Sequence, residues 1–66
     1  MKVQVNNKEV ETDFSITLAQ LTAQLALSPI GIAIAVNNRM IPRTAWGTQT
    51  LQENDAIVVI KAACGG

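Results

Sequence analysis

One short helical segment, set among segments with the pattern of β-strands, is the feature that most limits how this chain of 66 residues can fold. A capping box is predicted over residues 17–20, because the Thr17 hydroxyl can accept from a backbone N–H and the Gln20 side chain can reach back. Leucines then recur at helical spacing, so we expect an amphipathic helix over residues 18–26. A loop with three helix breakers is expected to end it: Ser28, Pro29 and Gly31.

The segment before the helix predicts a β-hairpin. Residues 1–6 alternate apolar and polar side chains, which is the period of a half-buried strand. Asn6-Asn7 suits a tight turn because asparagine tolerates a left-handed backbone, and residues 9–12 then form the returning strand. The side chains that we expect to face the core are Val3, Val5 and Val10.

Three strands are predicted after the helix, over residues 32–36, 39–41 and 56–62. The middle one should be short and at an edge, because Pro42 has no N–H to donate to a neighbouring strand. The segment 42–50 is expected to be irregular, with Trp46 folded over one end of the core. Turns are expected at Asn37-Asn38 and at Glu53-Asn54-Asp55.

These elements predict one α+β domain, a mixed sheet of four to five strands with one helix packed on one face. Residues 56–60 are all apolar, which is the composition of a strand buried on both faces, so we expect the last strand at the centre of the sheet and parallel to the first. The domain spans residues 1–66, with 62–66 as a flexible tail. The predicted core consists of Val3, Val5, Leu18, Leu21, Leu25, Ile57 and Val59.

The composition excludes several classes of function. Five basic and five acidic residues balance without clusters along the chain, which argues against binding to nucleic acid through phosphates. Without histidine the chain cannot form a Ser-His or Cys-His pair, and it offers a poor set of metal ligands. We therefore expect a protein that is not an enzyme and has neither a metal site nor a bound cofactor.

The same composition indicates a compartment. The single cysteine, Cys64, excludes an internal disulfide and fits a reducing environment. Neither a signal peptide nor an apolar segment long enough to span a bilayer is recognisable. We expect a monomer in the cytoplasm.

The last expected strand runs directly into Ala62-Ala63-Cys64-Gly65-Gly66. Two adjacent glycines bury no side chain and lose much conformational entropy when they are ordered. They do make a thin, bendable tail that a narrow cleft can admit. We therefore expect the chemistry to take place at the terminal carboxylate of Gly66, in the active site of another protein.

Over its whole length the sequence resembles the ThiS family of small sulfur-carrier proteins, which have the ubiquitin-like β-grasp fold. The positions that carry the resemblance are Asn6, Thr17-Leu18-Ala19-Gln20-Leu21, Ala35-Val36-Asn37, Ile41-Pro42-Arg43, Trp46, Asn54-Asp55 and Gly65-Gly66. The chain departs from the family at two turns. Asn38 stands where the family often has glycine, and Glu53-Asn54-Asp55 stands where it often has Asp-Gly-Asp.

The resemblance implies a sulfur carrier of thiamin biosynthesis. A ThiF-like adenylating enzyme would use ATP to activate the carboxylate of Gly66, a sulfur donor protein would convert it to a thiocarboxylate, and a ThiG-like thiazole synthase would take up the sulfur. Gly65 would let the tail thread into these partners. Cys64 is a variable position, where we expect a small residue that fits a tunnel and has no chemical role. Two alternatives remain open: a MoaD-like carrier for molybdopterin synthesis, and a ubiquitin-like tag or interaction module.

The apolar last strand also predicts a binding surface. One helix can cover only one face of the sheet, and side chains alternate along a strand, so Val58 and Ile60 should face away if Ile57 and Val59 face the helix. An exposed apolar patch on a small domain usually marks a partner site. We expect Val58 and Ile60, together with Met40, to dock on the adenylating enzyme and the synthase.

Overall fold

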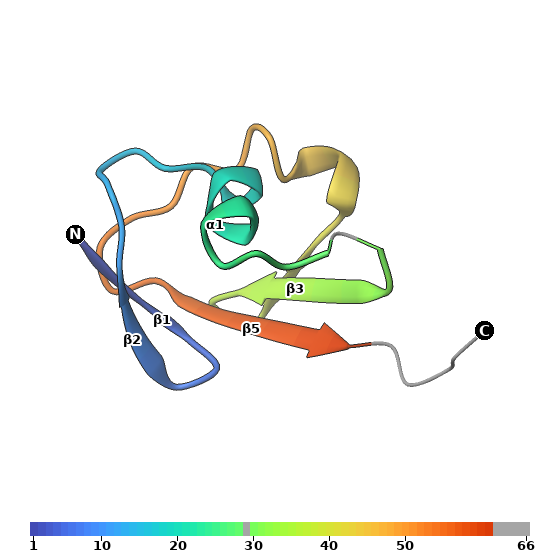
Figure 1. Cartoon of the computed structure of the whole chain (residues 1–66), viewed down its shortest axis with the longest axis horizontal. Coiled ribbons are helices and arrows are strands. Elements are labelled where there is room, and N and C mark those ends of the chain that lie inside the picture. The colour runs from blue at the N-terminus through green and yellow to red at the C-terminus, as the bar shows by residue number, and fades with distance from the viewer. Residues whose placement is uncertain (29, 62–66) are drawn as a thin grey trace.

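The structure is a computed structural model that describes residues 1–28 and 30–61. Five strands form one mixed sheet in the order β2-β1-β5-β3-β4 (Figure 1). A short 3-10 helix, η1, lies within the segment that was expected to be irregular. The elements in chain order are β1 (Lys2–Val5), β2 (Lys8–Glu11), α1 (Leu18–Gln24), β3 (Ile32–Val36), β4 (Arg39–Ile41), η1 (Arg43–Ala45) and β5 (Ala56–Lys61).

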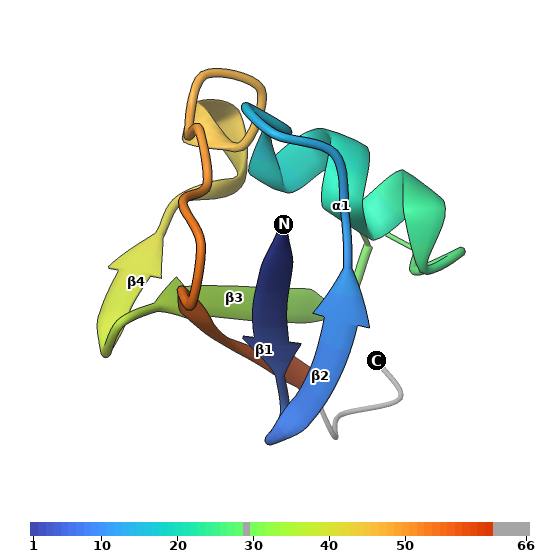
Figure 2. The ribbon, with the colours of Figure 1, turned by 90° about the vertical axis from the view of Figure 1, so that its left-hand side faces the viewer.

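The arrangement has two layers. Helix α1 and the segment that carries η1 lie over the same face of the sheet (Figure 2). Strand β5 lies between β1, to which it is parallel, and β3, to which it is antiparallel. The predicted α+β architecture and the central place of the last strand are therefore confirmed. Within the described residues, no helix is long and apolar enough to cross a membrane.

Two Asn-Asn turns close the hairpins and set their registers. Both asparagines of each turn have positive φ, 51° and 68° at Asn6 and Asn7, and 53° and 68° at Asn37 and Asn38. Positive φ at both central residues is the geometry of a type I′ turn, whose twist matches that of the flanking strands. Because such a turn has only two residues, β2 starts at Lys8, one residue earlier than predicted.

Helix α1 begins as predicted and ends earlier. The Thr17 hydroxyl accepts the Gln20 N–H at 3.2 Å, and Gln20 Oε1 accepts the Thr17 N–H at 2.9 Å, which confirms the capping box. The predicted end at Ala26 is wrong, because Ala26 has φ 56° and lies outside the helix. Its N–H bonds to Ala23 O at 3.1 Å and the Leu27 N–H bonds to Thr22 O at 2.9 Å. This pair of bonds is a Schellman motif, and an alanine occupies the position where glycine is usual.

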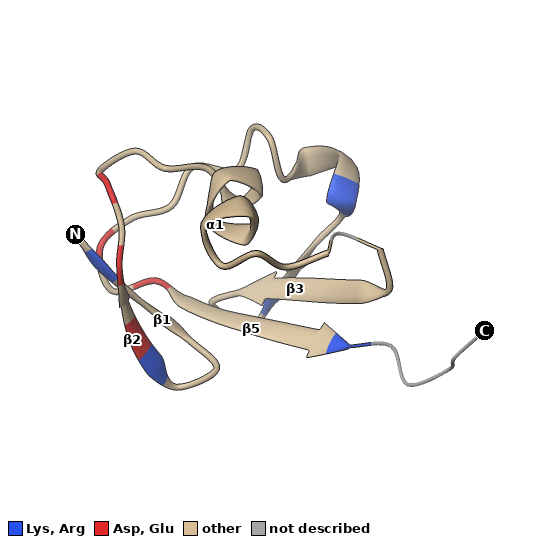
Figure 3. Cartoon of the chain, in the orientation of Figure 1, with Lys and Arg blue, Asp and Glu red and all other residues tan. Residues whose placement is uncertain are grey.

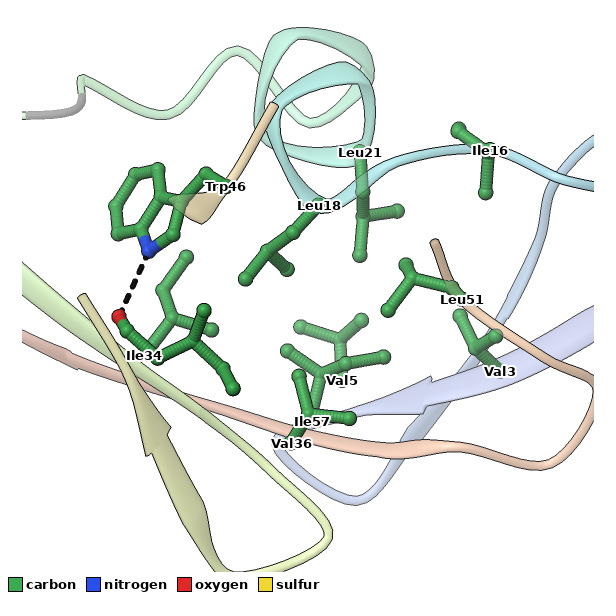
Figure 4. Close-up of a cluster of buried hydrophobic side chains, with 11 residues drawn as sticks. Val3, Val5, Ile16, Leu18, Leu21, Ile34, Val36, Trp46, Leu51 and Ile57 are labelled. Atoms are coloured by element: carbon green, nitrogen blue, oxygen red, sulfur yellow. Dashed lines mark hydrogen bonds between the residues drawn. The ribbon is translucent and has the colours of Figure 1, made fainter. Parts of the chain in front are cut away.

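The core lies between α1 and the inner face of the sheet (Figure 4). Five of the predicted core residues are buried: Val3, Val5, Leu18, Leu21 and Ile57. Leu25, Val59 and Val10 are only partly buried and pack against this cluster, since α1 ends at Gln24 and does not reach over the far end of the sheet. Further buried members are Ile16, Ile34, Val36, Ile41 and Leu51.

Trp46 covers one end of the core, as predicted. Its side chain is buried, and its ring Nε1–H donates to the carbonyl of Ile41 at 2.9 Å (Figure 4). The backbone of Trp46 also joins the η1 segment to α1, because Trp46 O accepts the Ala19 N–H at 3.1 Å. A buried indole N–H that has a partner avoids the cost of an unsatisfied donor.

Candidate functional site

The outer face of the sheet, opposite α1, carries an apolar patch over β4, β3 and β5. The cross-strand register places Met40 beside Ala35, Ala35 beside Val58, and Ala33 beside Ile60. We call these five residues the outer patch. Its three large side chains are well exposed, at 57% for Met40, 41% for Val58 and 48% for Ile60. The prediction that Val58 and Ile60 face away from the helix is confirmed, and Met40 lies in the same patch.

The exposure of these residues corrects one expectation about β5. The strand is central, but it is buried on its inner face only, and its apolar composition does not reflect burial on both faces. The half of the outer face formed by β1 and β2 is polar, with exposed Lys2, Gln4, Glu9 and Glu11. The apolar surface is therefore confined to the half of the sheet that lies on the β4 side, and β5 forms its boundary.

The residues predicted to take part in chemistry lie beyond β5. Gly66, Gly65 and Cys64 are outside the described residues. The strand that leads to them is fully described as far as Lys61, and it is the same strand that supplies Val58 and Ile60 to the outer patch. A partner that covers the patch is therefore brought next to the place where the chain leaves the sheet.

Two asparagine side chains hold β5 from the hairpin turns. Asn37 Oδ1 accepts the Ala56 N–H at 3.0 Å, and Asn37 Nδ2 donates to Asp55 Oδ1 at 3.0 Å, at the start of the strand. Asn6 Oδ1 accepts the Val59 N–H at 2.8 Å, farther along the strand and from its other side. The sequence alone assigns both asparagines to their turns, since positive φ is reason enough for asparagine there. Nothing in the pattern links either residue to the distant β5.

Charge is separated in space although it is balanced along the chain. The Asp and Glu residues gather in the half of the molecule that holds the N-terminus, together with the lysines of β1 and β2, whereas the described part of the half that holds the end of β5 carries Lys and Arg without acidic side chains (Figure 3). This grouping is not visible along the chain, because Glu53 and Asp55 are far in sequence from the other acidic residues.

The described residues contain no arrangement that resembles a catalytic centre. Within residues 1–28 and 30–61, no three His, Cys, Asp or Glu side chains come together in a way that could hold a metal ion. The Lys2–Glu9 ion pair, at 3.6 Å, joins two exposed side chains on neighbouring strands. The geometry shows an exposed apolar patch on the strand that leads to residues 62–66, and its use as a docking surface stays a prediction.

Comparisons with known proteins agree with this architecture. The sulfur carrier protein ThiS of Escherichia coli (strain K12) is 27% identical over 66 residues, and the match covers 100% of both chains. A crystal structure of the thiamine biosynthesis protein ThiS from Geobacter metallireducens superposes with a TM-score of 0.86 at 23% identity, again over 100% of both chains. A solution structure of a thiamine biosynthesis protein from the same organism gives a TM-score of 0.79 at 23% identity, covering 100% of this chain and 88% of the other. The model of the ThiS family matches residues 3–66, and the chain therefore belongs to the ThiS family.

Proposed function

We propose that this protein is a sulfur carrier of thiamin biosynthesis and that Gly66 carries the sulfur as a terminal thiocarboxylate. The observation that carries the proposal is the extent of the family match, which runs from β1 through the diglycine at Gly65-Gly66. The sulfur carrier of Escherichia coli, with which the chain aligns over its whole length, supports it. Neither the molybdopterin alternative nor the protein tag has comparable support.

The chemistry requires activation by a partner. A carboxylate is ionised at neutral pH and is a poor electrophile. In the proposed reaction, a Gly66 oxygen attacks the α-phosphorus of ATP and pyrophosphate leaves, which gives an acyl adenylate. A donor sulfur at the oxidation level of sulfide then attacks the carbonyl carbon, and AMP leaves with the former carboxylate oxygen. The product is a thiocarboxylate, and the carrier is consumed and regenerated as a cosubstrate of its partner enzymes.

The outer patch is the proposed docking surface for a ThiF-like adenylating enzyme and a ThiG-like thiazole synthase. The three large side chains of the outer patch, Met40, Val58 and Ile60, are each roughly half exposed, which leaves apolar surface available for burial. Burial of three such half-exposed side chains would contribute about 3 kcal/mol, enough to select a partner and not enough to lock two proteins together. A carrier that must visit two enzymes in turn needs a surface of this reversible kind.

The carrier role is tested by mass spectrometry of the intact chain after incubation with ATP, the adenylating enzyme and a sulfur donor. We expect the mass increase of one oxygen-to-sulfur exchange, located on the C-terminal peptide. In a chain extended by one residue beyond Gly66, the Gly66 carboxylate becomes part of a peptide bond and the free carboxylate lies on the added residue, up to about 3.6 Å farther out, so this chain should not be loaded. The Cys64→Ser variant is the matched control with an unchanged tail length, and it should be loaded normally.

Two results would contradict the proposal. Full loading of the extended chain would show that the carboxylate of Gly66 is not the acceptor. An isopeptide bond between Gly66 and lysines of other proteins, without sulfur loading, would favour the protein tag. Circular dichroism of each variant confirms that the domain remains folded, so that a loss of loading reports on the tail.

A further inference from the structure

Strand β5 extends beyond the end of β1, the strand that pairs with it on one side. The pairs between β1 and β5 end with Val5 and Ile57, after which one more backbone bond of 2.9 Å runs from the Asn6 N–H to Ile57 O. The chain then turns into β2, while β5 continues to Lys61. On the side of β3, in contrast, pairing continues to Ile32 and Lys61. The last part of β5 therefore has a backbone partner on one side only.

The side chain of Asn6 takes the place of the missing β1 backbone. Its Oδ1 accepts the Val59 N–H at 2.8 Å, and its Nδ2 donates to Val59 O over 3.4 Å. An acceptor and a donor directed at one residue are what the backbone of a neighbouring strand would offer if it continued. Asparagine is suited to this position, because it combines an amide with tolerance of the positive φ of 51° that the turn imposes.

We propose that Asn6 is a positioning residue for sulfur loading, which holds Val59 so that β5 presents the tail in one direction to the adenylating active site. The inference rests on the proposed function, because it assigns Asn6 a part in that reaction. Among the described residues, the bond to Val59 is the last that holds β5 from the β1 side. If it is lost, the end of the strand gains freedom, and docked molecules place the reacting carboxylate correctly less often.

Three variants separate this role from a general effect on folding. Asn6→Gly keeps the turn, since glycine accepts positive φ, and removes both bonds to Val59. Asn7→Gly is the matched control: it changes the second residue of the same turn, whose φ is 68°, and leaves the Asn6 side chain in place. Asn6→Asp is the conservative variant, because a carboxylate oxygen can still accept the Val59 N–H and aspartate also tolerates positive φ.

Two measurements are made on each variant: hydrogen exchange of the Val59 amide by NMR, and steady-state kinetics of sulfur loading. In Asn6→Gly we expect exchange about tenfold faster and kcat about fivefold lower, as follows from the loss of two solvent-exposed hydrogen bonds to Val59, the second of them long. KM should change less than about twofold, because none of the side chains of the outer patch is changed. Asn7→Gly should behave like the wild type in both measurements. Asn6→Asp keeps the bond to the Val59 N–H but cannot donate to Val59 O, so it should lie closer to the wild type than to Asn6→Gly.

Either of two results overturns the proposal: a wild-type kcat for Asn6→Gly, or Val59 exchange that is equally fast in Asn6→Gly and Asn7→Gly. If the wild-type kcat of Asn6→Gly is accompanied by a raised KM, Asn6 acts in docking. If the wild-type chain itself is not loaded, the proposed function fails and the assigned part in the reaction fails with it. The exchange data then still decide whether Asn6 holds Val59.

Discussion

The outer patch makes a quantitative prediction for the truncation of Ile60. Its side chain is 48% exposed in the free protein, so about half of its surface is available to a partner. Full burial of an isoleucine contributes about 1.5–3 kcal/mol, and the exposed half therefore contributes about 1 kcal/mol. Ile60→Ala should weaken binding to the adenylating enzyme about fivefold. Ile60→Asp should weaken it more than about a hundredfold, because a carboxylate would also have to lose its water.

Isothermal titration calorimetry with the adenylating enzyme, in the absence of ATP, measures the Kd. The matched control is Ile30→Ala, which truncates an isoleucine that is 77% exposed in the loop between α1 and β3 and lies outside the outer patch. If exposed apolar area alone governed binding, Ile30→Ala would have the larger effect. An unchanged Kd for Ile60→Ala, or equal losses for the two variants, would refute docking through the outer patch. Circular dichroism checks that neither variant is unfolded.

Further predictions concern the helix end, the tryptophan and the tail. Ala26→Gly should raise the free energy of unfolding by about 1 kcal/mol in urea, because glycine adopts the φ of 56° in the Schellman motif without strain. Trp46→Phe should lower it by about 2 kcal/mol, because the buried bond to Ile41 O is lost, and unchanged stability would show that this bond is unimportant. Gly66→Ala should slow adenylation and leave the urea midpoint unchanged, since it adds a methyl group beside the reacting carbon.

Much of the fold could be predicted because local signals and hydrophobic pattern agree. The capping box at Thr17 and the two Asn-Asn turns each have one strongly preferred geometry, and the structure shows it. The end of α1 could not be predicted, because its Schellman motif uses Ala26, which has no preference for positive φ. Leu51 is almost fully buried, but it stands alone between polar neighbours, and periodicity cannot identify an isolated core residue.

The part of the candidate site that could be predicted is the face of the sheet on which each side chain of the last strand lies. One helix covers one face, so alternation along β5 was enough to assign Val58 and Ile60 to the other. The contacts of Asn6 and Asn37 with β5 were not predictable. They join residues far apart in sequence, such as Asn6 and Val59, and depend on how far β1 extends along β5. The separation of charge likewise arises only when the fold brings distant acidic residues to one side.

In the proposed function, the central place of β5 lets a small domain present its C-terminal residues to another protein. A tail attached to an edge strand would be held from one side, and fraying of that strand would change its direction. β5 is held by β1 and the Asn6 side chain on one side and by β3 on the other, and Ile57 anchors it in the core. The alternate residues, Val58 and Ile60, remain outside for a partner. One strand thus combines an anchor in the core with the proposed docking surface, and its alternation of side chains keeps the two on opposite faces.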